Sequence, residues 1–152
     1  MPQSEVTRHL SVDEAWQEMS GRGAIYVDVR SPGEFAGGHP QGAYNVPLFV
    51  IDPRSGQLAP NEDFVAICTA LIAQHRAPAS DASVILGCAA GVRSRQAAEL
   101  IVAHGVGDLL ECVGGWHGAA GFQGWAMSDL PRATVAEDGR NWKRLREDLR
   151  AP

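Results

Sequence analysis

The chain has 152 residues, a formal net charge of -5 and 45% hydrophobic residues. This length fits one domain that can bury a sizeable core without disulfides or metal ions. The acidic balance and the lack of a basic run argue against a general nucleic-acid surface. No stretch approaches the about 18 apolar residues that a membrane span needs, so we expect neither a nucleic acid nor a membrane as a partner.

The cysteines and the N-terminal residues indicate a reducing compartment. There are 3 cysteines, an odd number, and none forms a C-x-x-C pair, which is typical of reduced thiols. Residues 1–10 are polar and carry no signal-peptide core. We therefore expect a cytoplasmic protein.

The first half of the chain alternates predicted helices and strands. Each of its first two helices begins with a capping box, in which a Ser and a Glu three residues later satisfy each other's backbone N–H groups. These pairs are Ser11 with Glu14 and Ser31 with Glu34. Apolar runs predict strands at residues 24–29 and 43–46. Residues 48–60 contain Pro and Gly and are predicted to form a long connection, either functional or a family insertion.

The following segments continue the alternation. A helix is predicted after Asn61, because apolar residues recur at helical spacing and include Cys68, which we therefore assign to the core. A strand is predicted at 108–113, with Cys112 as a packing residue. The next segment is rich in Gly and Ala and is predicted to gather its large apolar side chains in a turn or short helix. Those side chains are Trp116, Phe122, Trp125 and Met127.

The C-terminal residues 138–150 carry alternating charges with an apolar stripe at helical spacing. The stripe consists of Trp142, Leu145 and Leu149. This pattern predicts a surface helix that either docks on the domain or is offered to a partner. We place the domain at residues 1–131 and the helical tail at 132–152. Strands alternating with helices predict an α/β fold with a mostly parallel sheet covered on both faces.

Residues 83–104 predict a strand, a tight turn and a helix around one cysteine. The apolar run 84–86 fits a buried strand, and Cys88 follows it where the loop begins. Serine is a preferred N-cap residue, so Ser94 is the predicted N-cap of the following helix. Because ligands of open α/β sheets bind at the carboxyl ends of the strands, this position favours a reactive thiol over a packed one.

The turn at residues 88–93 favours a bound anion. Its N–H groups and the positive end of the following helix both attract negative charge, and Gly91 permits the left-handed backbone that a tight turn often needs. Arg93 and Arg95 add positive charge, and either could face the sulfur. We therefore expect the turn to favour the thiolate form of Cys88.

Three motifs coincide with those of a known family. The first runs through residues 27–35 and 38–47, the second is the turn 88–93, and the third runs from Gly114-Gly115-Trp116 to residue 131. With these motifs the chain resembles a single-domain rhodanese over roughly residues 9–131. The resemblance implies a rhodanese-like five-stranded parallel sheet with helices on both faces.

The resemblance also implies a sulfurtransferase that carries sulfane sulfur as a persulfide on Cys88. The implied donor is thiosulfate or a small persulfide, and the acceptor is a thiol, cyanide or a protein thiol. The site residues are the nucleophile Cys88, the persulfide-binding loop Ala89, Ala90, Gly91, Val92, Arg93 and Ser94, and the supporting residues Asp28, Arg30 and Trp116. Phe49 and Trp116 are candidates for the rim. The histidines show no ligand spacing, so no metal or cofactor is expected.

Two other functions remain open. A non-catalytic rhodanese-like module would carry sulfur or bind a partner, although such a module has no need of Cys88. Cysteine phosphatases share a cysteine-headed anion loop but separate the cysteine and arginine by one residue more than Cys88 and Arg93. Many thiosulfate-specific rhodaneses carry a cation just after the cysteine, where this chain has Ala89 and Ala90. Thiosulfate is therefore expected to be only a modest substrate.

Overall fold

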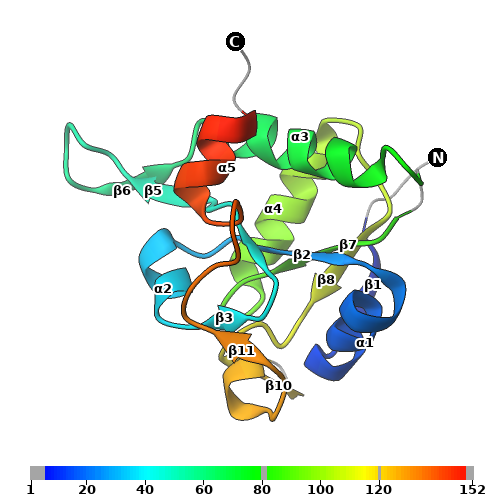
Figure 1. The fold of residues 1–152 in the computed structure, drawn as a ribbon. Helices are drawn as coiled ribbons and strands as arrows, with labels where there is room; N and C mark the ends of the chain where they lie inside the picture. The colour runs from blue at the N-terminus through cyan, green and yellow to red at the C-terminus, as the bar shows by residue number, and fades with distance from the viewer. Residues whose placement is uncertain (1–5, 80–81, 120, 150–152) are drawn as a thin grey trace.

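A five-stranded parallel sheet crosses the middle of the molecule in the computed structural model, which describes residues 6–79, 82–119 and 121–149 (Figure 1). The strands in spatial order are β1 (Val6–Leu10), β8 (Leu109–Cys112), β7 (Val84–Gly87), β2 (Ile25–Asp28) and β4 (Tyr44–Asn45). Every neighbouring pair runs parallel. The predicted fold class is confirmed.

The edge strand β1 is the one strand of this sheet that the pattern did not predict. It pairs with β8 on one side only, and the side chains of Arg8 and His9 are exposed. An edge strand of this kind needs no continuous apolar run, and residues 6–10 are mostly polar, so the sequence pattern did not indicate a strand. Residues 1–5 lie outside the described part of the chain.

Alternate residues of the central strands point to opposite faces of the sheet. On β2, Tyr26 packs with α1 (Val12–Arg22) and with Phe35 of α2 (Pro32–Ala36). The next residue, Val27, packs on the other face. That face is covered by α3 (Phe64–Arg76), α4 (Val92–Ala103) and α5 (Trp142–Leu149), as Figure 1 shows. Because successive side chains of a strand point to opposite faces, the sheet has one apolar layer on each side.

Both predicted capping boxes are present. The hydroxyl of Ser11 accepts from the N–H of Glu14, whose carboxylate accepts from the N–H of Ser11, and Ser31 pairs with Glu34 in the same way. Near α2, β3 (His39–Pro40) pairs with β11 (Arg132–Ala133). β3 follows α2 and β11 follows the third motif, so this pairing holds these two segments together.

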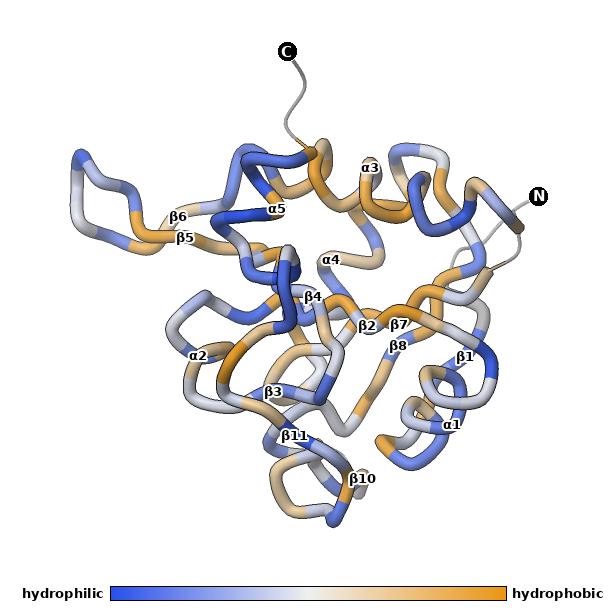
Figure 2. Tube along the Cα trace, viewed as in Figure 1, coloured by the Kyte–Doolittle hydropathy of each residue, from blue (hydrophilic) through white to orange (hydrophobic). Residues whose placement is uncertain are grey.

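Residues 48–60 form a β-hairpin where the sequence predicted a long connection. Its strands β5 (Phe49–Ile51) and β6 (Leu58–Pro60) are antiparallel and project from the body of the molecule (Figure 1). Ile51 and Leu58 are 60% and 62% exposed, and Figure 2 shows apolar residues on this projection. The apolar run from Leu48 to Ile51 carried a strand signal, but the Pro and Gly residues that follow it favoured a connection in the sequence prediction.

The predicted cluster after residue 114 is only partly correct. Trp125, in a 3-10 helix at Trp125–Met127, is fully buried, but Phe122 and Met127 are 39% and 72% exposed. Two short strands, β9 (Gly118–Ala119) and β10 (Phe122–Gln123), form an antiparallel pair just before this 3-10 helix. That pairing leaves the Phe122 side chain outside the core.

The C-terminal helix α5 packs on the domain. Trp142 and Leu145 are buried in the same apolar layer as α3 and α4. Of the two arrangements that the sequence left open for this helix, the structure shows the docked one. Within the described residues, no helix is long and apolar enough to cross a membrane.

Candidate active site

Cys88 lies between the carboxyl end of β7 and the first turn of α4. The helix begins at Val92, and its N-cap is Gly91, with φ of 88°. A residue with a side chain would be strained in that left-handed conformation, which explains the glycine. Ser94 was predicted to be the N-cap, and this is wrong: it lies inside the first turn and is fully buried. The helix starts earlier because Gly91 can turn the chain directly after the loop.

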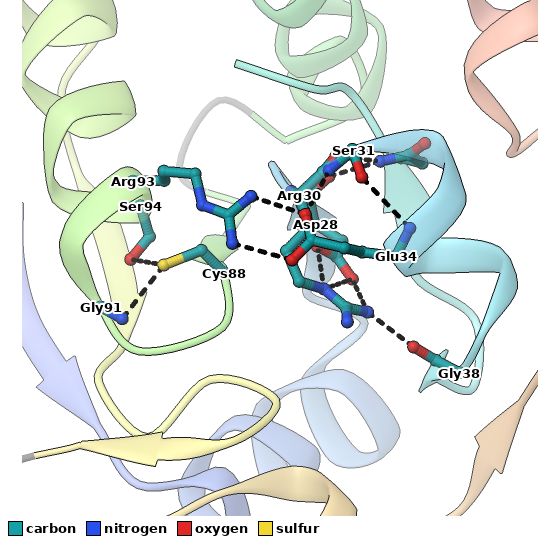
Figure 3. A network of polar contacts seen from close by, with 10 residues as sticks. Asp28, Arg30, Ser31, Glu34, Gly38, Cys88, Gly91, Arg93 and Ser94 are labelled. Atoms are coloured by element: carbon teal, nitrogen blue, oxygen red, sulfur yellow. Dashed lines mark hydrogen bonds and ion pairs between the residues drawn. The ribbon is translucent and has the colours of Figure 1, made fainter. Parts of the chain in front are cut away.

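The sulfur of Cys88 is enclosed by polar groups of this turn. The residue is 2% exposed, and its Sγ accepts a hydrogen bond from the Gly91 N–H at 3.1 Å. The thiol donates to the Ser94 Oγ at 3.4 Å, as drawn in Figure 3. The start of α4 adds the positive end of its helix dipole. The site therefore offers negative charge on sulfur both an N–H donor and a favourable field.

The loop is held from behind by the turn that carries the third motif. The Trp116 N–H donates to the carbonyl of Cys88 at 2.8 Å, and the His117 N–H donates to that of Ala89 at 2.9 Å. Gly115 makes this approach possible, because a Cβ there would lie 2.3 Å from the Cys88 carbonyl oxygen. The backbone of the turn thus fixes the position from which Cys88 projects.

Arg93 makes a two-pronged contact with Glu34 of α2. Its two terminal nitrogens lie 2.7 and 3.0 Å from the two carboxylate oxygens, which joins the loop to α2 (Figure 3). The hydrogen bond to Glu34 and, to a smaller extent, the charge of Cys88 raise the pKa of Arg93. Arg95 instead pairs with Glu99 on the exposed face of α4. Of the two arginines, Arg93 is therefore the one beside the sulfur, but Glu34 neutralises much of its charge.

The Glu34–Arg93 contact predicts acid sensitivity. The Arg93 hydrogen bond lowers the pKa of Glu34 from its usual 4.5 to about 2. Because the folded form has the lower pKa, this contact stabilises the fold fully above about pH 4.5, and the contribution is lost as the pH falls toward 2. We expect Glu34→Gln to lose less stability than the wild type over that range, as measured by thermal unfolding against pH. Equal slopes for the two proteins would contradict the assignment.

A second, fully buried ion pair braces the chain after β2. Asp28 and Arg30 are each 2% exposed, and the guanidinium bonds both oxygens of Asp28 at 2.8 to 3.2 Å. It also donates to the carbonyl of Gly38 at 2.6 Å and lies 5.2 Å from the centre of the Trp116 ring. Asp28, Arg30 and Trp116 thus connect β2, the end of α2 and the turn behind the cysteine. His39 supports the same region through its Nδ1 contact with the Phe35 carbonyl at 2.7 Å.

The remaining loop residues form the outer edge of the site. Ala89 is half-buried, Ala90 is exposed and Val92 is 66% exposed. Phe49 lines a cavity of about 720 Å³ between the hairpin and α5 and another of about 430 Å³ beside α4. Neither of these two cavities is lined by Cys88, and a place for Phe49 at the rim stays a prediction.

One residue near the sulfur was not predicted from the sequence. Glu111 of β8 is 5% exposed, and its Oε2 accepts a hydrogen bond from the Ser94 Oγ at 3.0 Å. The signal was present, because Glu111 is the one charged residue within the apolar strand Leu109–Cys112. Among the described residues, no group of three or more His, Cys, Asp or Glu is placed to hold a metal ion.

Comparison with known proteins identifies the family of this fold and loop. The model of the rhodanese-like domain matches residues 11–125. The chain belongs to the rhodanese-like domain family. It is 30% identical over 135 residues to thiosulfate sulfurtransferase GlpE of Haemophilus influenzae, covering 89% of this chain and 99% of that one. It is 32% identical over 129 residues to thiosulfate sulfurtransferase 16, chloroplastic, of Arabidopsis thaliana, covering 85% and 95%.

Solved rhodanese-like structures share the architecture. The crystal structure of Rv0390 from M. tuberculosis superposes with a TM-score of 0.61 at 23% identity, covering 86% of this chain and 99% of that one. A thiosulfate sulfurtransferase from Pseudomonas aeruginosa gives 0.59 at 18% identity, covering 89% of this chain and 21% of that one. At these identities the likeness shows the fold alone.

Proposed function

We propose that this protein is a sulfurtransferase that carries sulfane sulfur as a persulfide on Cys88. The observation that carries the proposal is the position of the Cys88 sulfur, which accepts the Gly91 N–H at the N-terminus of α4. Such a site stabilises an anionic sulfur. Membership of the rhodanese-like family and relatives named thiosulfate sulfurtransferase support the same reaction class.

The reaction proceeds in two half-reactions. The Cys88 thiolate attacks the sulfane sulfur of the donor, a new S–S bond forms, and the rest of the donor leaves with the electron pair of the broken bond. An acceptor thiolate or cyanide then attacks the outer sulfur, and Cys88 leaves as a thiolate. Each step moves one sulfur atom without net oxidation, so the cycle needs no redox cofactor.

The charges around the loop favour a donor of low charge. Ala89 and Ala90 place no cation at the mouth, and the Arg93 charge is shared with Glu34. A dianion such as thiosulfate therefore gains little electrostatic attraction there. We infer that a small persulfide or a protein persulfide is the better donor, and that a thiol is the acceptor.

Ala89→Arg should improve the use of thiosulfate. Ala89 is half-buried at the mouth, where an added cation attracts a dianion in a partly desolvated site. We expect kcat/KM for thiosulfate to rise by roughly tenfold at low salt and the gain to shrink as ionic strength increases. A persulfide donor of low charge, measured beside it, should respond much less.

The matched control is Ala89→Gln, which adds a long polar side chain without charge. It separates the effect of charge from that of crowding in the loop. An equal loss for both donors in both variants would show that loop packing requires a small residue at position 89. In that case the low-charge donor preference would lose its support.

The reaction class is tested by comparing two activities of the purified protein. We expect thiocyanate from cyanide with a sulfane donor, and no hydrolysis of p-nitrophenyl phosphate. Phosphatase activity is less consistent with this site, because the Arg93 guanidinium is paired with the Glu34 carboxylate at 2.7 Å and is not free to bind a phosphate. A protein that accepts sulfur but releases none to cyanide or to thiols would instead be a carrier module.

A further inference from the structure

A chain of polar contacts runs from the active-site sulfur into the sheet. Cys88 contacts the Ser94 hydroxyl at 3.4 Å, and that hydroxyl donates to the Glu111 Oε2 at 3.0 Å. The other carboxylate oxygen of Glu111 lies 3.3 Å from the Nε2 of His9, whose side chain is 63% exposed. A buried carboxylate is thus connected to the nucleophile through one hydroxyl.

The direction of these hydrogen bonds matters for the thiol. A hydroxyl has one hydrogen, and when Ser94 gives it to Glu111 it can only accept from Cys88. It then holds the S–H form of the cysteine and offers no donor to a thiolate. The negative charge of Glu111 acts in the same sense, since a like charge nearby disfavours ionisation.

We propose that Glu111 is a positioning residue that, through Ser94, limits the share of Cys88 present as thiolate near neutral pH. The proposal deepens the proposed function, on which it rests, because the thiolate is the form that attacks the donor. Glu111 opposes the Gly91 N–H, the α4 dipole and the charge that Arg93 retains beside Glu34, all of which favour the thiolate. The reactivity of Cys88 reflects the balance between them.

The other titratable groups around Glu111 do not change the direction of its effect on the Cys88 thiolate. They are His9 on β1, Cys88 on the loop after β7 and Cys112 on β8 itself. His9 is exposed and reaches the carboxylate from the solvent side. Burial, with smaller contributions that include the charges of Cys88 and Glu111, raises the pKa of Cys112 to about 11. Glu111 therefore already acts against ionisation of a neighbouring thiol.

The test is the rate of Cys88 alkylation by iodoacetamide against pH, followed by peptide mass spectrometry. The pKa values of Cys68 and Cys112 are raised to about 12 and about 11, so those thiols stay largely unreactive near neutral pH. In Glu111→Gln the amide can donate to Ser94, which frees the hydroxyl hydrogen for the sulfur. We expect the rate at pH 6 to 7 to rise about tenfold and the midpoint of the curve to fall by about one pH unit.

Two further variants separate the hydrogen bond from the charge. Glu111→Asp keeps the charge but draws the carboxylate back from Ser94, and we expect a smaller gain in the same direction. It also keeps the test available if Glu111→Gln fails to fold. In a Ser94→Ala background the gain from Glu111→Gln should shrink, because the connecting hydroxyl is gone. The control Glu99→Gln makes the same chemical change on the exposed face of α4 and should leave the curve unchanged.

A slower or unchanged alkylation in folded Glu111→Gln would overturn the proposal. A gain of the same size with and without Ser94 would overturn the role of the hydroxyl. Alkylation needs no sulfur donor, so this test stands apart from the proposed function. A protein that takes up no sulfur but shows the expected alkylation shifts would refute the sulfurtransferase and leave the role of Glu111 intact.

Discussion

Cys88→Ser is expected to lower sulfur transfer by roughly 10³-fold or more, because a serine oxygen cannot hold a persulfide. The fold should be preserved, since a hydroxyl is close in size to a thiol and can accept the same Gly91 N–H. The measurement is thiocyanate production from a sulfane donor and cyanide, with thermal unfolding as the check on folding.

The two other cysteines provide the matched controls. Cys68 and Cys112 are both fully buried, one on α3 and one on β8. Cys68→Ala and Cys112→Ala should therefore keep the activity of the wild type, apart from a modest loss of stability. Activity that survives Cys88→Ser and disappears in one of these variants would contradict the assignment of the nucleophile.

The second large effect is expected at the buried ion pair. In Arg30→Met, the Asp28 carboxylate stays 2% exposed and loses its cation. Breaking one partner of such a pair costs about 3–5 kcal/mol of the free energy of unfolding. The Gly38 carbonyl also loses its donor. Denaturant unfolding of the variant measures the loss.

A double variant and an exposed pair calibrate that loss. Asp28→Asn combined with Arg30→Met removes both charges and should cost less than Arg30→Met alone. Arg95→Met breaks an exposed pair with Glu99 and should change stability by less than about 1 kcal/mol. If Arg30→Met were no worse than Arg95→Met, the buried pair would not brace the fold as described.

Local patterns predicted much of the fold. Capping boxes at Ser11 and Ser31 marked helix starts that the structure reproduces, and apolar runs marked the central strands β2, β7 and β8. These signals are reliable because they depend on neighbours within one turn or one strand. The position of Cys88 after β7 followed from the same kind of local signal.

Features that depend on distant parts of the chain could not be predicted in this way. β1 is defined by its pairing with β8, and the direction of Arg93 by a carboxylate 59 residues away. Ser94 was misplaced because a glycine took the N-cap position, which left the hydroxyl free to connect Cys88 with Glu111. The contact of Ser94 with Glu111 arises only when the sheet brings β8 beside β7.

Intact mass spectrometry after incubation with a sulfane donor tests the central claim most directly. The wild-type protein, exposed in turn to thiosulfate and glutathione persulfide, should gain the mass of one sulfur atom. Peptide mapping should locate it on Cys88, reduction should remove it, and the persulfide donor should load the protein faster. A protein that gains no sulfur from either donor, or gains it on Cys68 or Cys112, would contradict the account.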